Sequence, residues 1–595
     1  MGARHKMAPM ARQRGAVRPS TARSDVRATF PDGRVFEGPL GTTLEQFVGA
    51  AYPEAPAPIA AALQDGRLRE LSSGLTRDAE LVPIAIDQDD GARIFRRSLI
   101  FLMVTAAAEE FPDAELVVQH SVPGFGGFYC EVRSRPPFSD AELAALEARM
   151  RGIVTSGERI SKLRVPATEA VALFAGRGEL DKALLFSQVG TAPVPLYELR
   201  GRRDYYQGYM VTSAGCLAPF ALRNHPPGFV LHFPHQHRPT SVDEAAPYPK
   251  LFKVFARANY LLEQLGIRNV GALNDAVAGG RLPEVSLVAE AMHEAAVAQI
   301  ARDIASHAQP PIRVVLVAGP SASGKTTFAK RLAIQLLARG LKPFALALDD
   351  YFFDRDLTPR DEHGEHDFES LEAIDIALLN QHLRSLVAGR PTDLPRYSFL
   401  LGRRERGLTM TLREDSIIIV EGIHGLNPAL VVDVPPQSVY RIYVSALTQL
   451  NLDRHSRVST SDTRLIRRLV RDAATRGHDA TDSLRRWISV GRGEKQHIFP
   501  FQENSDAIFD SSLVHDLVVL RPFAEPLLLQ VERDLAEYRE ARRLIGLLRW
   551  FRPASPANVP DNSILREFIG GSILKDFSIW PEAGSTLAGR SRSPA

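Results

Sequence analysis

The C-terminal half of the chain alternates short apolar runs with longer stretches of helical periodicity. Residues 313–318 (RVVLVA) form an apolar run of strand length, and apolar residues recur at helical spacing across Lys325–Arg339. Two more apolar runs, Phe344–Leu348 and Ile417–Val420, end in acidic residues. This order predicts an α/β domain over residues 309–524, with a parallel sheet covered by helices on both faces. The first helix is expected to bury Phe328, Leu332, Leu336 and Leu337.

The N-terminal half shows a different pattern. Val26–Phe30 and Arg34–Glu37 alternate apolar and polar positions across a Pro-Asp-Gly turn, which predicts a hairpin. The stretch 241–308 is mostly of helical character and ends at two prolines. The predicted order is a disordered basic tail (1–24), a compact β-rich unit (25–88), a larger unit (89–240), a helical connector (241–308), the α/β domain (309–524), and a helical C-terminal segment with a tail (525–595).

The turn between the first apolar run and its helix, Gly319–Thr326 (GPSASGKT), fits the phosphate-loop pattern G-x-x-x-x-G-K-[ST]. Its glycines allow backbone amides to close around a phosphate, and the helix N-terminus adds a positive dipole end. Lys325 is expected to reach the β- and γ-phosphates, and the Thr326 hydroxyl to hold Mg²⁺. The residues predicted to bind ATP (or GTP) here are Gly319, Ser321, Ala322, Ser323, Gly324, Lys325, Thr326 and Thr327.

Carboxylates follow the next two predicted strands. The carboxyl ends of parallel strands line the ligand crevice, so Asp349 and Glu421 are expected to converge on the phosphate loop. Phosphoryl transfer to a hydroxyl needs a carboxylate that orients or accepts its proton. Asp349 is the candidate, with Asp350 beside it as the alternative. Glu421 follows its strand like a Walker-B acid and suits Mg²⁺, either directly or through water.

An arginine-rich helix is predicted over Asp462–Ala474. Arg464, Arg467 and two further arginines share one broad face, with few acidic neighbours in the sequence. The positive charges on such a face repel one another unless anions bind there. This favours a lid that closes over phosphates. Arg468 and Arg471 are the main candidates for contact with the transferred phosphoryl group, and Arg476 is a further ATP contact.

Composition limits the class of protein and the cellular compartment in which this chemistry is expected. The net charge of +2 argues against a dedicated nucleic-acid-binding protein. Two distant cysteines, Cys130 and Cys216, exclude a disulfide framework and fit a reducing compartment. The longest apolar run, near Leu99–Ala108, is about half the ~20 residues that span a membrane. The N-terminus lacks the apolar core of a signal peptide. We therefore expect a cytoplasmic protein without a membrane segment.

The α/β stretch resembles the uridine kinases of the phosphoribulokinase/uridine kinase family. The matching pieces, in the family's order, are GPSASGKTT, LDDYF, DFESLEAID, LPRYSF, IIIVEGIHGLN, DTRLIRRLVRDAATRG and FPFQENSDAIFDSSL. The resemblance implies an ATP- and Mg²⁺-dependent kinase that phosphorylates the 5′-hydroxyl of a nucleoside such as uridine or cytidine. It implies these acceptor contacts: Asp349, Tyr351, Glu369, Tyr397, Arg468 and His478.

Three positions depart from the family's acceptor pocket. Gly402 stands where uridine kinases have a base-contacting His, His478 replaces an Arg, and Arg486 replaces a Gln. A pocket that lacks one hydrogen-bonding group can lose discrimination by orders of magnitude. The resemblance therefore leaves the acceptor open between uridine or cytidine, another nucleoside and a different small alcohol.

The front half resembles parts of threonyl-tRNA synthetases. ATFPDGRVFEGPLGTTLEQFVGA is similar to a TGS domain, which implies a β-grasp fold for 25–88. Residues 89–240 are similar to the second additional domain, an α+β editing domain whose metal ligands fall here on Arg97, Phe101, Tyr206 and Met210. Such side chains do not form a Zn²⁺ site, so the resemblance implies the fold without the editing metal. It also raises an alternative function, a nucleotide-gated RNA-binding or regulatory protein.

Overall fold

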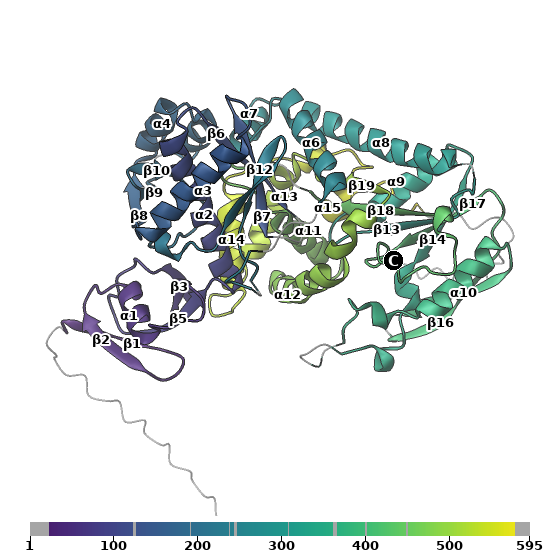
Figure 1. Cartoon of the computed structure of the whole chain (residues 1–595). Helices are drawn as coiled ribbons and strands as arrows, with labels where there is room; N and C mark the ends of the chain where they lie inside the picture. Colours follow the sequence, from purple (N-terminus) through teal and green to yellow (C-terminus); the bar gives the residue numbers. More distant parts are fainter. Residues whose placement is uncertain are drawn as a thin grey trace, which may run out of the picture.

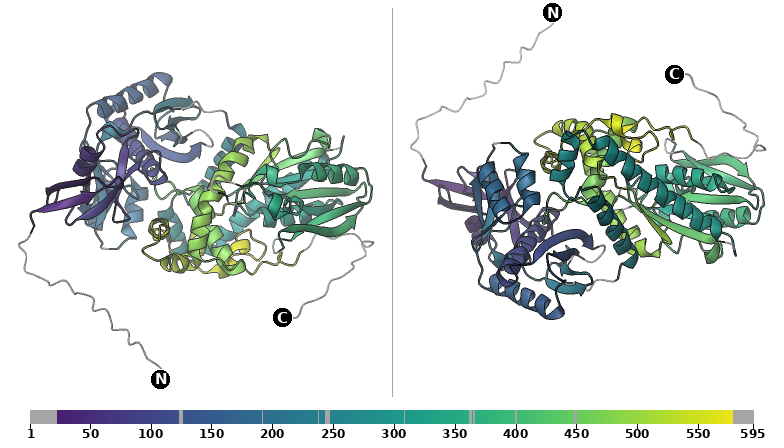
Figure 2. Two further views of the ribbon diagram at one scale, coloured as in Figure 1. Left: turned by 90° about the horizontal axis from the view of Figure 1, so that it is seen from below. Right: turned by 90° about the horizontal axis from the view of Figure 1, so that it is seen from above.

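The computed structural model describes residues 23–577, except 123–125, 191, 237, 243–246, 308, 361–363, 365, 399–400 and 448–449. The predicted tail at 1–24 therefore lies almost entirely outside the described residues, as does the end of the C-terminal segment. The chain forms an elongated body with the N-terminal units at one end and the α/β unit at the other (Figures 1 and 2).

The first unit is a five-stranded sheet with one helix, α1 (Leu44–Ala51). Its strand order is β2 (Val35–Pro39), β1 (Asp25–Thr29), β5 (Ala79–Ala85), β3 (Ile59–Gln64) and β4 (Arg67–Glu70). The predicted hairpin forms, since β1 and β2 pair antiparallel. Helix α1 begins with a capping box, in which Thr43 and Gln46 satisfy each other's backbone amides. This small sheet with one covering helix fits the expected β-grasp fold.

The second unit packs two antiparallel sheets around the long helix α2 (Asp89–Glu110). One sheet is β11 (Ala221–His225), β12 (Gly228–His232), β7 (Gly127–Arg133) and β6 (Glu115–Val122); the other is β10 (Arg202–Asp204), β9 (Val194–Leu199) and β8 (Ser161–Val165). Its other helices are α3 (Asp140–Thr155), α4 (Ala167–Gly176) and α5 (Leu180–Ser187). The centre of α2 is buried nearly all round. None of the helices in the described ranges is both long and apolar enough to cross a bilayer.

Three helices connect the two halves: α6 (Pro249–Gln264), α7 (Val270–Ala278) and α8 (Leu282–Ser306). After the α/β unit, the expected helical C-terminal segment contains a turn between α13 (Asp516–Leu529) and α14 (Tyr538–Leu548). Helix α14 bridges the halves: Arg93 of α2 lies 3.4 Å from Glu540, and Arg543 donates to Asp462 of α11 at 2.6 and 2.7 Å. The short helix α15 (Arg566–Ile569) follows.

The α/β unit is the predicted parallel sheet. Its strand order is β14 (Lys342–Ala347), β17 (Ser416–Glu421), β13 (Val314–Ala318), β18 (Val439–Ser445) and β19 (Ala507–Asp510), with every neighbouring pair parallel. The helices are α9 (Lys325–Leu337), α10 (Ile376–Val387), α11 (Thr460–Thr475), α12 (Ala480–His497) and α13, and a hairpin of β15 (Thr392–Ser398) and β16 (Arg403–Met410) is attached.

Alternate residues of each central strand face opposite layers. Val315 and Val317 of β13 pack in the cluster that includes α8 and α9, whereas Val314 and Leu316 pack in the cluster that includes α10. Helices therefore cover both faces, which confirms the predicted fold class. Helix α9 buries three of its four expected apolar residues, but Leu337 is 40% exposed because α9 ends there.

Candidate active site

The phosphate loop connects β13 to α9 as the sequence predicts, and it leaves no room for a side chain at its first glycine. A Cβ atom at Gly319 would lie 1.9 Å from the carbonyl oxygen of Val444 on the neighbouring strand. Gly324 takes a φ of 82° and Ala322 a φ of 57°, both in the left-handed region. Ser323 is fully buried within the turn. The loop ends at the first turn of α9, where the backbone amide groups lack partners within the helix, and such groups can bind an anion.

The predicted metal-binding pair comes together at this loop. The Thr326 hydroxyl donates to Oε1 of Glu421 at 2.7 Å, across the boundary between α9 and β17. Burial raises the pKa of Glu421, and Lys325 opposes that shift. A hydroxyl and a carboxylate oxygen side by side are the donors that Mg²⁺ prefers, so these two residues fit the ion that the family uses. Among the described residues, no group of three or more His, Cys, Asp or Glu side chains is arranged so that it could hold a metal ion.

Lys325 lies inside the loop, with Nζ donating to the carbonyl oxygen of Pro320 at 3.1 Å. Burial lowers its pKa, although nearby carboxylates, Glu421 first, counteract the shift. Asp349 follows β14 on the same edge of the sheet. Asp349 remains in contact with solvent. The surrounding protein nevertheless removes water from its carboxyl and so raises its pKa, whereas the positive charge of Lys325 lowers it. An acid with a raised pKa near a lysine and a phosphate loop is suited to hold or accept a proton.

The adjacent Asp350 has a structural role in this geometry. Its Oδ1 accepts a hydrogen bond from the backbone amide of Tyr397 at 3.0 Å, which ties the end of β14 to the β15–β16 hairpin. This engagement favours Asp349 over Asp350 as the carboxylate that faces an acceptor.

The expectation that the α11 arginines have few acidic partners is wrong. Arg464 pairs with Glu494 at 2.6 Å, and Arg467 pairs with Asp516. Arg468 and Arg471 both reach Asp472, at 3.2 and 2.8 Å. Arg476 also lies 3.6 Å from Asp472. Two of the three acids, Glu494 and Asp516, come from α12 and α13, so helical spacing within α11 could not reveal them.

Helix α11 nevertheless contacts the phosphate loop through Ser321. Arg468 Nη1 donates to the Ser321 hydroxyl at 2.9 Å, and Arg464 Nη1 donates to the Ser321 carbonyl at 3.1 Å. Glu494 completes the contact by accepting from the Ser321 amide at 2.9 Å. Arg464 and Glu494 are each 2% exposed. The sequence analysis missed Glu494, because nothing in the local pattern of α12 distinguishes it.

Among the predicted acceptor residues, Glu369 and Tyr397 have different surroundings from Tyr351. Glu369 lies against α12, where a Cβ atom on Gly493 would be 2.8 Å from the Glu369 Cβ. Burial, and secondly the charge of Glu494, raise the pKa of Glu369 to about 7. Tyr397 is buried on β15, with its ring 5.7 Å from that of Phe352.

Tyr351 differs from Glu369 and Tyr397. It is fully buried, and its hydroxyl meets His382 of α10 at 3.1 Å, so its side chain is part of the core rather than of the crevice.

The three departing positions lie at two places around the crevice. Gly402 forms the β15–β16 turn with a φ of 66°, and a Cβ atom there would lie 3.0 Å from the guanidinium carbon of Arg355. His478 and Arg486 meet each other: Nε2 of the imidazole lies 3.1 Å from Nη1 of the guanidinium. These two substitutions therefore form one contact at the start of α12.

The four residues at the editing-metal positions also converge. Arg97 Nη1 donates to the carbonyl oxygen of Tyr209 at 2.6 Å, next to Met210. The rings of Phe101 and Tyr206 lie 5.4 Å apart. Burial lowers the pKa of Arg97 to about 10. The positions at which the resemblance implies a metal site thus hold an arginine and packed aromatic side chains here.

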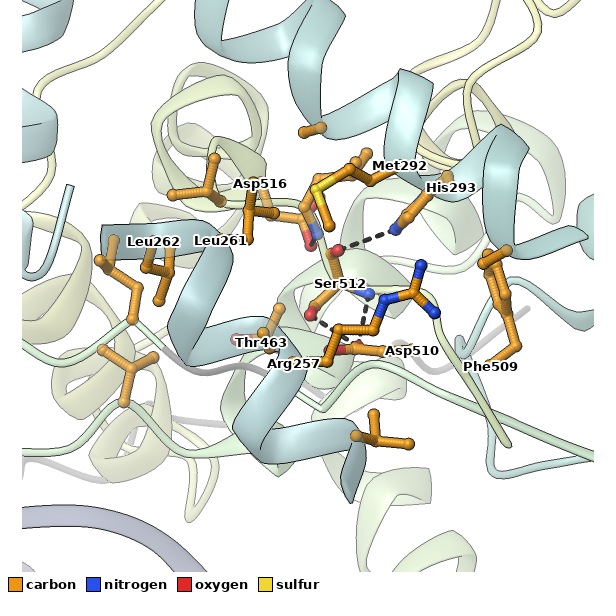
Figure 3. Close-up of a pocket in the computed structure, with 18 of the residues that line it drawn as sticks. Arg257, Leu261, Leu262, Met292, His293, Thr463, Phe509, Asp510, Ser512 and Asp516 are labelled. Carbon is orange, nitrogen blue, oxygen red and sulfur yellow. Dashed lines mark hydrogen bonds between the residues drawn. The ribbon is translucent and has the colours of Figure 1, made fainter. Parts of the chain in front are cut away.

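A separate cavity of about 150 Å³ lies away from the phosphate loop (Figure 3). It is bounded by α6, α8, the end of β19 and the start of α11, and apolar side chains such as Leu261 and Met292 make up most of its lining. His293 Nε2 lies 3.1 Å from the carbonyl oxygen of Ser512 at its edge. The cavity contains none of the residues predicted to bind nucleotide or acceptor.

Comparisons with known proteins divide the chain in the same way. The first listed relatives are threonine–tRNA ligases: that of Acidovorax sp. (strain JS42) is 32% identical over 200 residues, 33% of this chain and 31% of the ligase. The ligase of Symbiobacterium thermophilum is also 32% identical, over 33% of this chain and 30% of its own length. The chain thus spans about a third of the length of these relatives. The similarity covers its N-terminal region.

A solved structure described as a possible uridine kinase from Bacillus stearothermophilus is 22% identical, covers 24% of this chain and 79% of its own, and has a TM-score of 0.21. Residues 314–517 match the model of the Phosphoribulokinase / Uridine kinase family, and this match contains the phosphate loop, Asp349, Glu421 and helix α11. The C-terminal half of the chain therefore contains a kinase domain of the phosphoribulokinase/uridine kinase family.

Proposed function

We propose that this protein transfers the γ-phosphoryl group of ATP or GTP to the hydroxyl of a small-molecule acceptor, a nucleoside of the uridine or cytidine type. One observation carries the proposal: the Thr326–Glu421 pair and Asp349 are placed around a phosphate loop by strands β13, β14 and β17. Phosphoryl transfer depends mainly on positioning and on stabilising charge, and these residues supply both.

Each residue has a separate role in this proposal. The loop amides and Lys325 bind the β- and γ-phosphates, and Thr326 with Glu421 would hold Mg²⁺. When bound, that ion neutralises charge on the phosphate oxygens. Asp349 orients the acceptor hydroxyl and takes its proton as the new O–P bond forms and the bond to the β-phosphate oxygen breaks. Arg468, already in contact with Ser321, provides positive charge beside the transferred group, with Arg471 and Arg476 behind it.

On the acceptor side, Glu369 binds the hydroxyl groups of the sugar and Tyr397 packs near the base, with His478 at the rim. Gly402 and the His478–Arg486 contact replace the base-reading groups of uridine kinases. The proposed acceptor class is therefore supported by the residue expected to bind the sugar, Glu369. Substrate profiling decides which base is preferred.

The test is Mg²⁺-dependent consumption of ATP by the purified full chain against a panel of nucleosides and small sugar alcohols. Asp349→Asn is expected to lower kcat by at least about 10²-fold, because it removes the proton acceptor and preserves the shape. The matched control is Asp356→Asn, which removes an exposed carboxylate in the neighbouring turn and should leave turnover unchanged. Nucleotide binding without turnover of any acceptor would contradict the kinase proposal.

A second candidate is a nucleotide-gated RNA-binding protein. It is favoured by the contacts between the N-terminal region, which resembles threonine–tRNA ligases, and the chain that leads into α11. RNA binding whose affinity falls steeply with salt and changes on addition of ATP would support this candidate. A salt-insensitive or absent RNA interaction would remove it.

A further inference from the structure

A carboxylate from the C-terminal end of the chain binds the phosphate-loop helix. Glu567 Oε2 accepts hydrogen bonds from the Thr327 hydroxyl at 2.7 Å and from the Thr327 backbone amide at 3.3 Å. Thr327 is the third residue of α9, so its amide is one of the four at the helix start that lack a partner within the helix. Those amides are what a phosphate loop offers to nucleotide phosphate. Glu567 thus uses a donor that a bound nucleotide also requires.

The main chain around Glu567 is fixed in place. Ile564, Leu565 and Phe568 are fully buried in the core that includes α9 and α11. Ile564 packs so closely that a Cβ atom on Gly324 would lie 2.5 Å from its Cγ2 atom. From further along the segment, the carbonyl oxygen of Leu574 accepts from Lys330 of α9 at 2.7 Å. Only the Glu567 side chain therefore needs to move when the donors of Thr327 change partner.

The charge around Glu567 also belongs to the nucleotide site. Burial lowers the pKa of Lys325 and that of Arg476. The negative charge of the nearby Glu567 carboxylate acts in the opposite direction and raises both pKa values. An anion in this position stabilises α9 through the helix dipole. The same negative charge repels a phosphate placed on the loop. Because Glu567 is tethered, its effective concentration at Thr327 is on the order of millimolar or higher, so even a weak carboxylate contact competes with nucleotide.

We infer that Glu567 is an internal competitor of the nucleotide phosphates: it occupies the amide and hydroxyl of Thr327 and thereby sets the nucleotide affinity of the loop. This inference rests on the proposed nucleotide site but not on the identity of the acceptor. It assigns a function in the kinase domain to a residue that lies beyond the 314–517 family match.

Direct binding titrations of the full chain with ATP, without acceptor, test the inference. Glu567→Gln keeps the side-chain shape and removes the charge, and it is expected to bind ATP roughly tenfold more tightly than the unmodified protein. Inorganic tripolyphosphate should gain affinity to a similar degree, and adenosine should not, because the competition is for phosphate contacts. Glu567→Asp, which keeps the charge but shortens the reach to Thr327, should give a smaller gain.

Glu532→Gln is the matched control, since it makes the same chemical change at an exposed position between α13 and α14. It should leave ATP affinity unchanged. If the unmodified protein binds ATP, and both Glu567 variants bind it equally well or more weakly at an unchanged melting temperature, the inference is overturned while the proposed function stands. If neither the unmodified protein nor the variants bind ATP or tripolyphosphate, both are overturned.

Discussion

The contact between α12 and the phosphate loop leads to a quantitative prediction about Glu494. Its two carboxylate oxygens accept from Arg464 at 2.6 and 2.8 Å, and one also accepts from the Ser321 amide at 2.9 Å. Both side chains are almost completely buried. Glu494→Ala leaves the guanidinium of Arg464 in the interior without its counter-charge. Breaking a buried pair in this way costs about 3–5 kcal/mol of folding free energy.

Equilibrium unfolding in urea measures this cost. The guanidinium carbon of Arg464 lies 5.3 Å from the centre of the Trp487 ring, so Trp487 gives a local fluorescence signal once the other two tryptophans of the chain are replaced by phenylalanine. In a chain of several domains, the transition seen by Trp487 is the relevant one, and only its midpoint should move. Glu284→Ala is the control: its partner Arg281 is 3.0 Å away, but both side chains are about half exposed, so no shift of the midpoint is expected.

The double variant Arg464→Met and Glu494→Met separates stability from function. Replacing both charges with apolar side chains of similar length should recover most of the lost stability. It does not restore the contacts to the backbone of Ser321, so its ATP affinity should be lower than that of the unmodified protein. A Glu494→Ala protein within about 1 kcal/mol of the unmodified chain would refute the reasoning, since the pair would then contribute no more than an exposed one.

Three further predictions follow from single sites. Gly319→Ala should abolish ATP binding in a titration, because its Cβ atom would lie 1.9 Å from the carbonyl oxygen of Val444 and force the loop to move. Glu369, with a pKa of about 7, becomes an ionised acceptor only as the pH rises through neutrality. The KM for the acceptor should therefore fall between about pH 6 and pH 8, and Glu369→Gln should remove this dependence. Lys182→Met should lower the free energy of unfolding by about 3–5 kcal/mol in urea titrations, because fully buried Lys182 neutralises the fully buried Asp204.

The phosphate loop could be predicted because its requirements are local. Gly319 and Gly324 are needed by the turn itself, and Lys325 with Thr326 follows at fixed spacing. The order of strands and helices then places Asp349 and Glu421 at one edge of the sheet. The close contact of Thr326 with Glu421, 95 residues apart, agrees with that expectation.

The partners of the arginines could not be predicted in the same way. Glu494 lies 30 residues beyond Arg464, and Asp516 lies 49 beyond Arg467. Glu567 lies 240 residues beyond Thr327. Helical spacing shows which arginines share a face of α11, but it contains no information about which helix packs on that face. Such pairs are determined by tertiary packing, which a single sequence does not show.

The N-terminal region is joined to the kinase domain through the chain that leads into α11. Asn451 Nδ2 donates to the Val118 carbonyl at 2.8 Å, and Arg454 forms two bonds of 2.9 and 2.7 Å to Asp181 of α5. The fully buried Lys182 lies 2.8 Å from Nδ1 of His455. From α11, Arg468 reaches Ser321 of the phosphate loop. A movement of α11 on nucleotide binding must therefore either break these contacts or carry the N-terminal region with it. Because breaking the partly buried Arg454–Asp181 pair together with the buried Lys182–His455 contact is costly, movement as one body is the favoured outcome.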